Sequence, residues 1–80
     1  MEKYGFTQYF EEKVLLKRPY LTKGICIKVV ENPLIVERQE YNRYRFWGEI
    51  AEIEGKILRV VTLEDKLTIH NAFLDRRAKL

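Results

Sequence analysis

The chain has 80 residues, of which 46% are hydrophobic and 34% are charged, and its formal net charge is +3. These values are typical of a single globular domain over residues 1–80 and exclude a disordered or collagen-like chain. The apolar runs are too short to span a bilayer and no secretory signal peptide is visible, so we expect a cytoplasmic protein with no membrane partner. One cysteine and one histidine exclude an internal disulfide and a structural zinc site, and we expect neither a metal nor a cofactor.

The first predicted helix follows a loose lead-in at residues 1–5. Thr7 is a suitable N-cap, and the helix has to end before Pro19. Phe6, Phe10 and Val14 are spaced four residues apart, so they share the face that we expect to lie on a sheet.

A second helix is predicted over residues 23–31. Thr22 is its N-cap, and the helix ends at Asn32 because the residue before Pro33 is disfavoured in helical geometry. The β-branched residues in this segment would also suit a strand, but we favour the helix. Its predicted buried stripe consists of Leu21, Ile25, Cys26, Val29 and Val30.

The second half of the chain predicts a meander of strands. Four runs are rich in apolar and β-branched residues, and turn-forming residues separate them. Glu54-Gly55 is typical of a two-residue hairpin between the second and third runs. The predicted strands are residues 34–39, 44–53, 56–63 and 67–73. The predicted fold is therefore α+β, with two N-terminal helices packed on one face of a roughly four-stranded antiparallel meander sheet.

The hairpin at Glu54-Gly55 also decides which side chains face the helices, because a slip by one residue exchanges the two faces of a strand. The predicted core face carries Tyr44, Phe46, Gly48, Ile50, Ile57, Arg59, Val61, Leu63, Leu67, Ile69, Asn71 and Phe73. The opposite face is predicted to carry Arg45, Trp47, Glu49, Ala51, Leu58, Val60, Thr62, Thr68, His70 and Ala72. Arg45, Trp47 and His70 are thus expected to share one surface.

Several segments resemble a group of small, largely uncharacterised bacterial proteins. They are the sequence RVVTLED at residues 59–65, the ending TIHNAF at residues 68–73 with Asp75-Arg76, and shorter matches at residues 18–22 and 45–48. The order of helix, helix and sheet is more distantly similar to the RelE/ParE superfamily of toxins, especially the compact BrnT-like branch. That similarity implies a ribonuclease that uses basic and aromatic residues and no metal.

Three residues are candidates for catalysis of RNA cleavage. His70 is the candidate base or acid, because the ordinary pKa of histidine lies near neutrality. Arg45 and Arg59 could hold a phosphate through paired N–H donors. One histidine cannot make both proton transfers, so a tyrosine, lysine or arginine would make the other. The alternative for His70 is a half-exposed strand residue that hydrogen-bonds to a neighbour.

The remaining candidates concern binding. Trp47 is expected to expose its indole for a base or a partner protein. For Arg59, a structural clamp with Asp75 or Glu12 is favoured over contact with an anion, because half-buried arginines are usually paired. The predicted contacts for nucleic acid or a partner are Arg43, Trp47, Thr68, Arg76 and Arg77.

Two functions remain open. The first is a toxin-type endoribonuclease that acts on RNA or the ribosome without metal and is neutralised by an antitoxin. The second is a non-catalytic interaction or dimerisation domain, which uses the exposed sheet face or the free edge of the strand at residues 34–39. The absence of serine and of any glycine-rich phosphate loop excludes most other hydrolase schemes.

Overall fold

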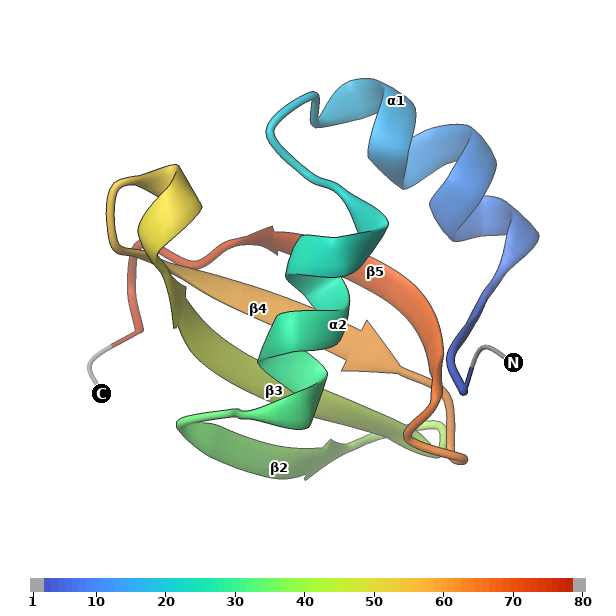
Figure 1. Ribbon diagram of the computed structural model, residues 1–80. Helices are drawn as coiled ribbons and strands as arrows, with labels where there is room; N and C mark the ends of the chain where they lie inside the picture. The colour runs from blue at the N-terminus through green and yellow to red at the C-terminus, as the bar shows by residue number, and fades with distance from the viewer. Residues whose placement is uncertain (1–2, 79–80) are drawn as a thin grey trace.

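The computed structural model describes residues 3–78, which form an α+β fold with two helical segments and a five-stranded mixed sheet (Figure 1). The helical segments are a π-helical turn at Phe10–Val14 (η1) that continues into α1 (Leu15–Lys17), and α2 (Lys23–Glu31). The strands are β1 (Gly5–Phe6), β2 (Ile35–Gln39), β3 (Arg43–Ile50), β4 (Lys56–Thr62) and β5 (Thr68–Leu74). Within residues 3–78, no helix is long and apolar enough to cross a membrane.

The sheet order is β1-β5-β4-β3-β2, in which the last four strands form the predicted antiparallel meander. The expected lead-in at residues 1–5 is wrong in part, because β1 adds a fifth, parallel strand beside β5. Hydrogen bonds from Gly5 N–H to the Leu67 carbonyl and from Thr7 N–H to the Ile69 carbonyl, both 3.0 Å, hold it there. A strand of two residues carries no periodic signal, so only long-range pairing reveals it.

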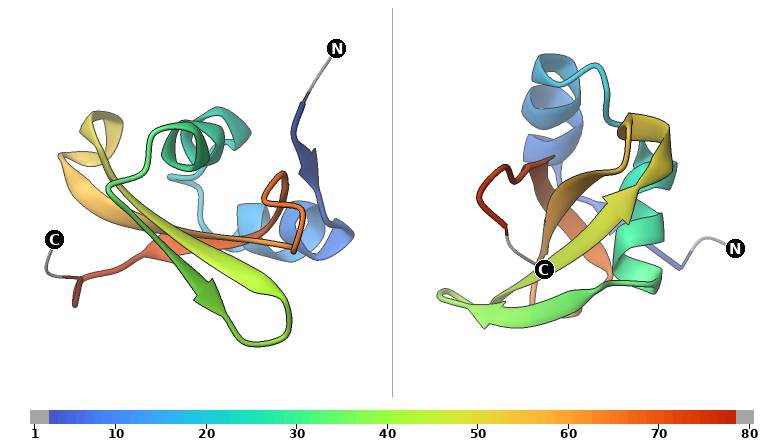
Figure 2. Two further views of the ribbon diagram at one scale, coloured as in Figure 1. Left: turned by 90° about the horizontal axis from the view of Figure 1, so that it is seen from below. Right: turned by 90° about the vertical axis from the view of Figure 1, so that its left-hand side faces the viewer.

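Both helical segments contribute to one core. The segment of η1 and α1 packs beside β5, while α2 lies across β3 and β4 (Figure 2). Phe10 and Val14 are buried from the first segment, as their spacing predicts. Thr7 Oγ1 accepts a hydrogen bond from Phe10 N–H at 3.1 Å, which is the expected N-cap interaction.

The predicted helix over residues 23–31 is confirmed. Thr22 Oγ1 accepts from Ile25 N–H at 3.1 Å, and Ile25, Cys26 and Val29 are buried against the sheet. Capping and the helical spacing of these buried residues therefore outweigh the strand preference of its β-branched residues. Burial raises the pKa of the Cys26 thiol to about 12, so this cysteine is an inert part of the core.

The predicted two-residue hairpin at Glu54-Gly55 is wrong. Ile50 pairs with Lys56, so the connection has five residues and contains the 3₁₀ turn η2 (Ala51–Ile53). Glu54 and Gly55 then have φ angles of 57° and 71°, in the left-handed region that brings the chain back into β4. The longer loop shifts the β3–β4 pairing by three residues relative to the predicted hairpin.

An odd shift exchanges the two faces of β4. Phe46 lies opposite Val60 and Trp47 lies opposite Arg59. The predicted core positions Ile57, Arg59 and Val61 therefore face away from α2. The side chains Leu58, Val60 and Thr62, predicted to face outwards, are fully buried in the core instead.

The faces of β5 were also predicted incorrectly, for a second reason. The β4–β5 register changes between Val61, opposite Asn71, and Thr62, opposite Ile69, so His70 is an extra residue in a β-bulge. Ile69 is buried as predicted, and Ala72 is buried contrary to prediction. Leu67, Asn71 and Phe73 were predicted in the core, but each retains partial exposure, as does Leu63 on the chain before them.

Gly48 on β3 sets the distance between α2 and the sheet. A Cβ atom at this position would lie 3.2 Å and 3.3 Å from the two methyl groups of Val29, and 3.5 Å from its Cα. The contacts with the two methyl groups are tighter than usual, so Val29 would have to move by a few tenths of an ångström. The close approach of helix and strand therefore favours glycine here.

Gly48→Ala is expected to lower the free energy of unfolding by about 1–3 kcal/mol, because the added methyl group overpacks the core. Gly24→Ala is the matched control: Gly24 is exposed on α2, and its Cβ would meet nothing nearer than Thr22 Oγ1 at 3.9 Å. That control should be neutral or should stabilise the protein by up to about 1 kcal/mol. Urea unfolding measures both, and equal midpoints for Gly48→Ala and wild type would contradict the predicted contact.

Candidate functional site

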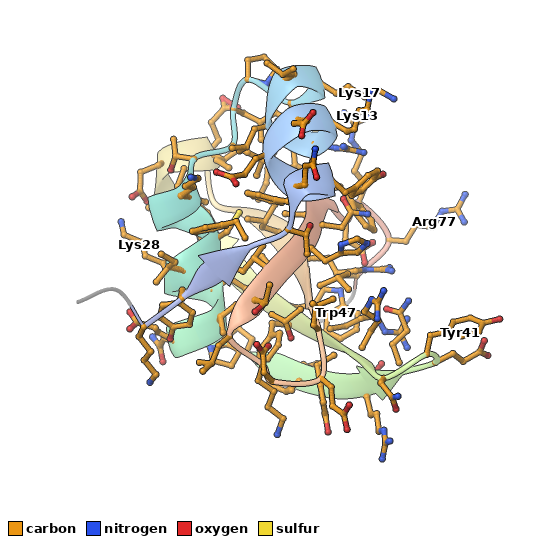
Figure 3. All side chains as sticks on the ribbon, turned by 90° about the vertical axis from the view of Figure 1, so that its right-hand side faces the viewer. Lys13, Lys17, Lys28, Tyr41, Trp47 and Arg77 are labelled. Atoms are coloured by element: carbon orange, nitrogen blue, oxygen red, sulfur yellow. The ribbon has the colours of Figure 1, made fainter. Side chains whose placement is uncertain are left out.

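The face of the sheet opposite α2, here called the open face, carries most of the predicted site residues. Arg43, Arg45 and Trp47 come from alternate positions of β3, and Arg59 joins them from β4 through the cross-strand pair with Trp47. Figure 3 shows Lys13, Lys17 and Arg77 on the same side of the molecule as Trp47, with Lys28 of α2 on the opposite side. The open face is therefore rich in positive charge.

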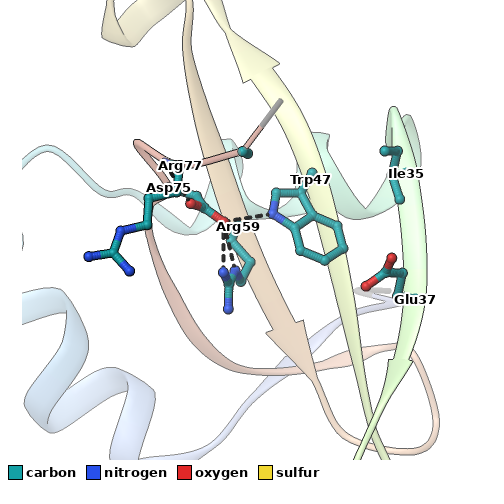
Figure 4. Close-up of a pocket in the computed structure, with 7 residues that line it drawn as sticks. Ile35, Glu37, Trp47, Arg59, Asp75 and Arg77 are labelled. Carbon is teal, nitrogen blue, oxygen red and sulfur yellow. Dashed lines mark hydrogen bonds and ion pairs between the residues drawn. The ribbon is translucent and has the colours of Figure 1, made fainter. Parts of the chain in front are cut away.

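Asp75 is the centre of the hydrogen bonding on this face. Its Oδ2 accepts from Trp47 Nε1 at 3.0 Å and from Arg59 Nε and Nη2 at 3.1 Å and 2.7 Å (Figure 4). Its Oδ1 accepts from the backbone N–H of Arg77 at 3.0 Å. Of the two acidic partners considered for Arg59, Asp75 is thus the one that forms the clamp.

These bonds change the acidity of Asp75. The hydrogen bonds from Trp47 and Arg59 stabilise the charged carboxylate and lower the pKa of Asp75 from 3.8 to about 2. Only 9% of the side chain is exposed. The carboxylate therefore stays ionised at any physiological pH and joins β3, β4 and the segment after β5.

Trp47 lies within this cluster rather than on the surface. Its side chain is only 7% exposed, so the prediction of an exposed indole is wrong. The guanidinium carbons of Arg45 and Arg59 are each 5.4 Å from its ring centroid, and that of Arg59 is 4.8 Å from the ring of Phe73. These cation–π contacts cover the indole, because arginine side chains stack readily on aromatic rings.

Arg45 and Arg43 have weaker partners. Arg45 Nη2 is 3.3 Å from Glu37 Oε1 on β2, and its side chain is 30% exposed. Arg43 Nη1 donates to the backbone carbonyl of Tyr41 at 3.0 Å. No ion pair of Arg43 is found within residues 3–78, so this guanidinium keeps most of its donors for another group.

His70 occupies a second part of the open face, beside the start of the first helical segment. Its Nδ1 is 3.0 Å from Thr7 Oγ1, and its ring lies 5.1 Å from the ring of Tyr9. Burial and the positive charge of Arg43 both lower its pKa below the ordinary 6.5. The lowered pKa favours the neutral form of His70, whose ring is held by Thr7 and lies close to the phenol ring of Tyr9.

Sequence reasoning missed Tyr9 and Thr7 as members of this site. Thr7 was identified only as an N-cap, and it performs that role as well, through Phe10 N–H. Tyr9 is 48% exposed, and it reaches His70 because the first helical segment packs on β5. No local pattern in the sequence connects residue 9 with residue 70, which lie in separate elements.

The other predicted contacts lie apart from these two groups. The Thr68 hydroxyl donates to Asp65 Oδ2 at 2.6 Å and stabilises the turn before β5. Arg76 is exposed beside Lys56 and Leu74, at a separate hollow. Arg77 lines a hollow of about 310 Å³ next to the Asp75 cluster. Among residues 3–78, no cluster of three or more histidine, cysteine, aspartate or glutamate side chains could hold a metal ion.

Asp75→Asn is expected to destabilise the protein by about 2–3 kcal/mol at pH 7, because it removes the charge that pairs with Arg59 in a largely buried position. The pKa of Asp75 is lowered on folding, so its stabilisation is complete above pH 4 and is lost as the pH falls towards 2. Thermal unfolding between pH 2 and pH 7 measures this. The Asp75→Asn variant should show a shallower loss of stability in acid than wild type, and parallel curves would contradict the role of Asp75.

The pKa of His70 is expected to lie below 6.5 and to rise in Arg43→Ala, since removing the positive charge favours protonation. Because its pKa is lowered on folding, His70 should contribute stability above pH 6.5 that is lost as the pH falls through 6.5 to the folded-state pKa. An NMR titration of the single imidazole measures the pKa directly. A value above 6.5 would contradict the lowering of the pKa by burial, and no change in Arg43→Ala would show that the two side chains do not interact.

The chain matches no protein-family model, no curated protein and no solved structure. Its similarity to small bacterial proteins and to RelE/ParE toxins therefore stays a prediction from the sequence.

Proposed function

We propose that this chain is a toxin-type protein of the RelE/BrnT-like kind, which binds and cleaves RNA on the open face. The observation that carries the proposal is the group of Tyr9, His70 and Arg43, in which the imidazole lies 5.1 Å from the phenol ring and its pKa is lowered by burial and by the charge of the Arg43 guanidinium. These are the three chemical roles that RNA cleavage by internal transfer requires. An antitoxin that covers the open face would neutralise the activity.

In the proposed reaction, the neutral imidazole of His70 removes the proton of a ribose 2′-hydroxyl. The 2′-oxygen forms a bond to the adjacent phosphorus while the bond from phosphorus to the 5′-oxygen breaks. The phenol of Tyr9 gives its proton to that leaving oxygen, and Arg43 stabilises the negative charge on the phosphate. The products are a 2′,3′-cyclic phosphate and a 5′-hydroxyl end.

Arg45 and Arg59 have supporting roles in this proposal. Both guanidinium groups lie against Trp47, and each has a carboxylate partner, Glu37 for Arg45 and Asp75 for Arg59. Their charge is thus partly compensated, which suits them to orient the RNA backbone more than to stabilise the reacting phosphate. The exposed positive side chains Lys13, Lys17 and Arg77 extend the same surface (Figure 3).

A second candidate, a dimerisation domain, is favoured by the edge strand β2. Leu34, Ile35 and Val36 are 59%, 38% and 44% exposed, which is unusual for apolar residues at the free edge of a sheet. A second copy could pair with this edge. Such a dimer would be compatible with RNA cleavage, because β2 lies at the margin of the open face.

Expression in a bacterial host is expected to arrest growth, and the purified protein should cleave RNA in the presence of a chelator. His70→Ala and Tyr9→Phe should each lower the cleavage rate by about 100-fold or more, the usual contribution of a general acid or base. Lys28→Ala is the control, because Lys28 lies on the opposite side of the molecule and pairs with Glu52. Melting temperatures would show that the variants are folded.

The proposal is wrong if total RNA and translating ribosomes stay intact with the wild-type protein, or if His70→Ala cleaves as fast as wild type. A dimer in light scattering, combined with no affinity for RNA at low salt, would support the second candidate instead. RNA affinity through arginine and lysine contacts should fall steeply as salt is added, whereas an apolar strand-to-strand dimer should persist.

A further inference from the structure

The hollow beside the Asp75 cluster has a shape and a set of polar groups that the proposed reaction does not use. It lies between β2 and the segment that follows β5, and its volume of about 310 Å³ is at the lower end of the range for small-ligand sites. Figure 4 shows Ile35 and Glu37 on one side and Asp75 with Arg77 on the other. The lining residues are Ile35, Glu37, Trp47, Arg59, Asp75, Arg77 and Ala78.

We infer that this hollow binds one guanine nucleotide, with Glu37 contacting the base and Arg77 contacting the phosphate. The inference rests on the proposed function, since it names the base that a bound RNA would place beside Trp47. It concerns a binding site separate from the group of Tyr9, His70 and Arg43.

The two carboxylates of the hollow differ in the hydrogen bonds that they can still accept. Asp75 is 9% exposed and already accepts four hydrogen bonds, from Trp47, Arg59 and the Arg77 backbone. The side chain of Glu37 is 54% exposed, and Arg45 Nη2 approaches its Oε1 at 3.3 Å. Glu37 is therefore the carboxylate that a ligand can reach.

A carboxylate that can still accept hydrogen bonds favours guanine among the four bases. Guanine presents two neighbouring donors, N1–H and the N2 amino group, on its Watson–Crick edge, and a carboxylate offers two acceptors at matching spacing. Guanine also carries the acceptor O6 on that edge, but its two donors are adjacent, whereas the single donor position of adenine, cytosine or uracil has an acceptor next to it that would lie against a negative oxygen. The apolar parts of the hollow, from Ile35 and Ala78, cover the flat surface of the ring.

The positive groups of the hollow lie on the side away from Glu37. The Arg77 side chain is exposed, and no ion pair of Arg77 is found among residues 3–78. Arg59 uses Nε and Nη2 for Asp75, and no hydrogen bond of its Nη1 is found in the same part of the chain. Arg77 and Arg59 Nη1 therefore both keep donors that can hold the phosphate while Glu37 holds the base.

Trp47 is the only tryptophan of the chain and lines the hollow, so its fluorescence reports binding there. Titration with the four nucleoside 5′-monophosphates should show saturable binding, tightest for the guanine nucleotide. Glu37→Gln should reduce the preference for guanine by about 5- to 150-fold, the range for loss of one bidentate base contact. Arg77→Ala should weaken all four nucleotides together. Glu52→Gln is the control, since Glu52 pairs with Lys28 on the opposite side.

The inference is overturned if no nucleotide gives saturable binding, if all four bind equally, or if Glu37→Gln keeps the guanine preference of the wild type. Urea unfolding of each variant shows that any loss is local. The test separates this inference from the proposed function. If the protein cleaves RNA but binds no guanine nucleotide, the proposed function is supported and the guanine site is wrong. If it binds the guanine nucleotide but cleaves no RNA, the guanine site is supported and the proposed function is wrong.

Discussion

The register between β3 and β4 is the constraint on which the rest of the structure depends. It places Phe46 opposite Val60 in the core and Trp47 opposite Arg59 on the open face. The loop over residues 51–55 sets this register, because its 3₁₀ turn and two left-handed residues return the chain three positions away from a tight hairpin. A change of register by one residue would exchange the two faces of β4, so that the Arg59 guanidinium would turn into the core and Val60 would turn to the surface.

A charged cluster on the open face follows from that register. With Arg59 beside Trp47, the carboxylate of Asp75 can accept from the indole and the guanidinium together. The same carboxylate holds the backbone of Arg77, so the segment after β5 is drawn against the sheet. Polar groups that would be costly to bury singly are satisfied as a set, and this gives the open face a rigid centre. The hollow at Arg77 and the charge around it are consequences of this arrangement.

The neighbourhood of His70 depends on two further irregularities. His70 is the extra residue of the bulge in β5 and stays out of the core, while Ile69 before it and Ala72 two positions after it are fully buried. The parallel strand β1 then brings Thr7 and Tyr9 to this point of β5. His70 is held in place at Nδ1 by Thr7, while its ring stays partly exposed. Functional side chains are often held in this way by a rigid fold. The proposed RNA site thus uses positions where the regular sheet is interrupted.

The sequence by itself determined the α+β class, the caps at Thr7 and Thr22, the meander of strands and the pairing of Arg59 with an acidic residue. Each of these follows from local spacing, capping chemistry or the cost of an unpaired charge. The faces of β4 and β5, the burial of Trp47 and the meeting of Tyr9 with His70 were decided only by the tertiary structure. They depend on a loop length, a bulge and a two-residue strand, whose free energies come from contacts between distant residues and leave no periodic pattern in the chain.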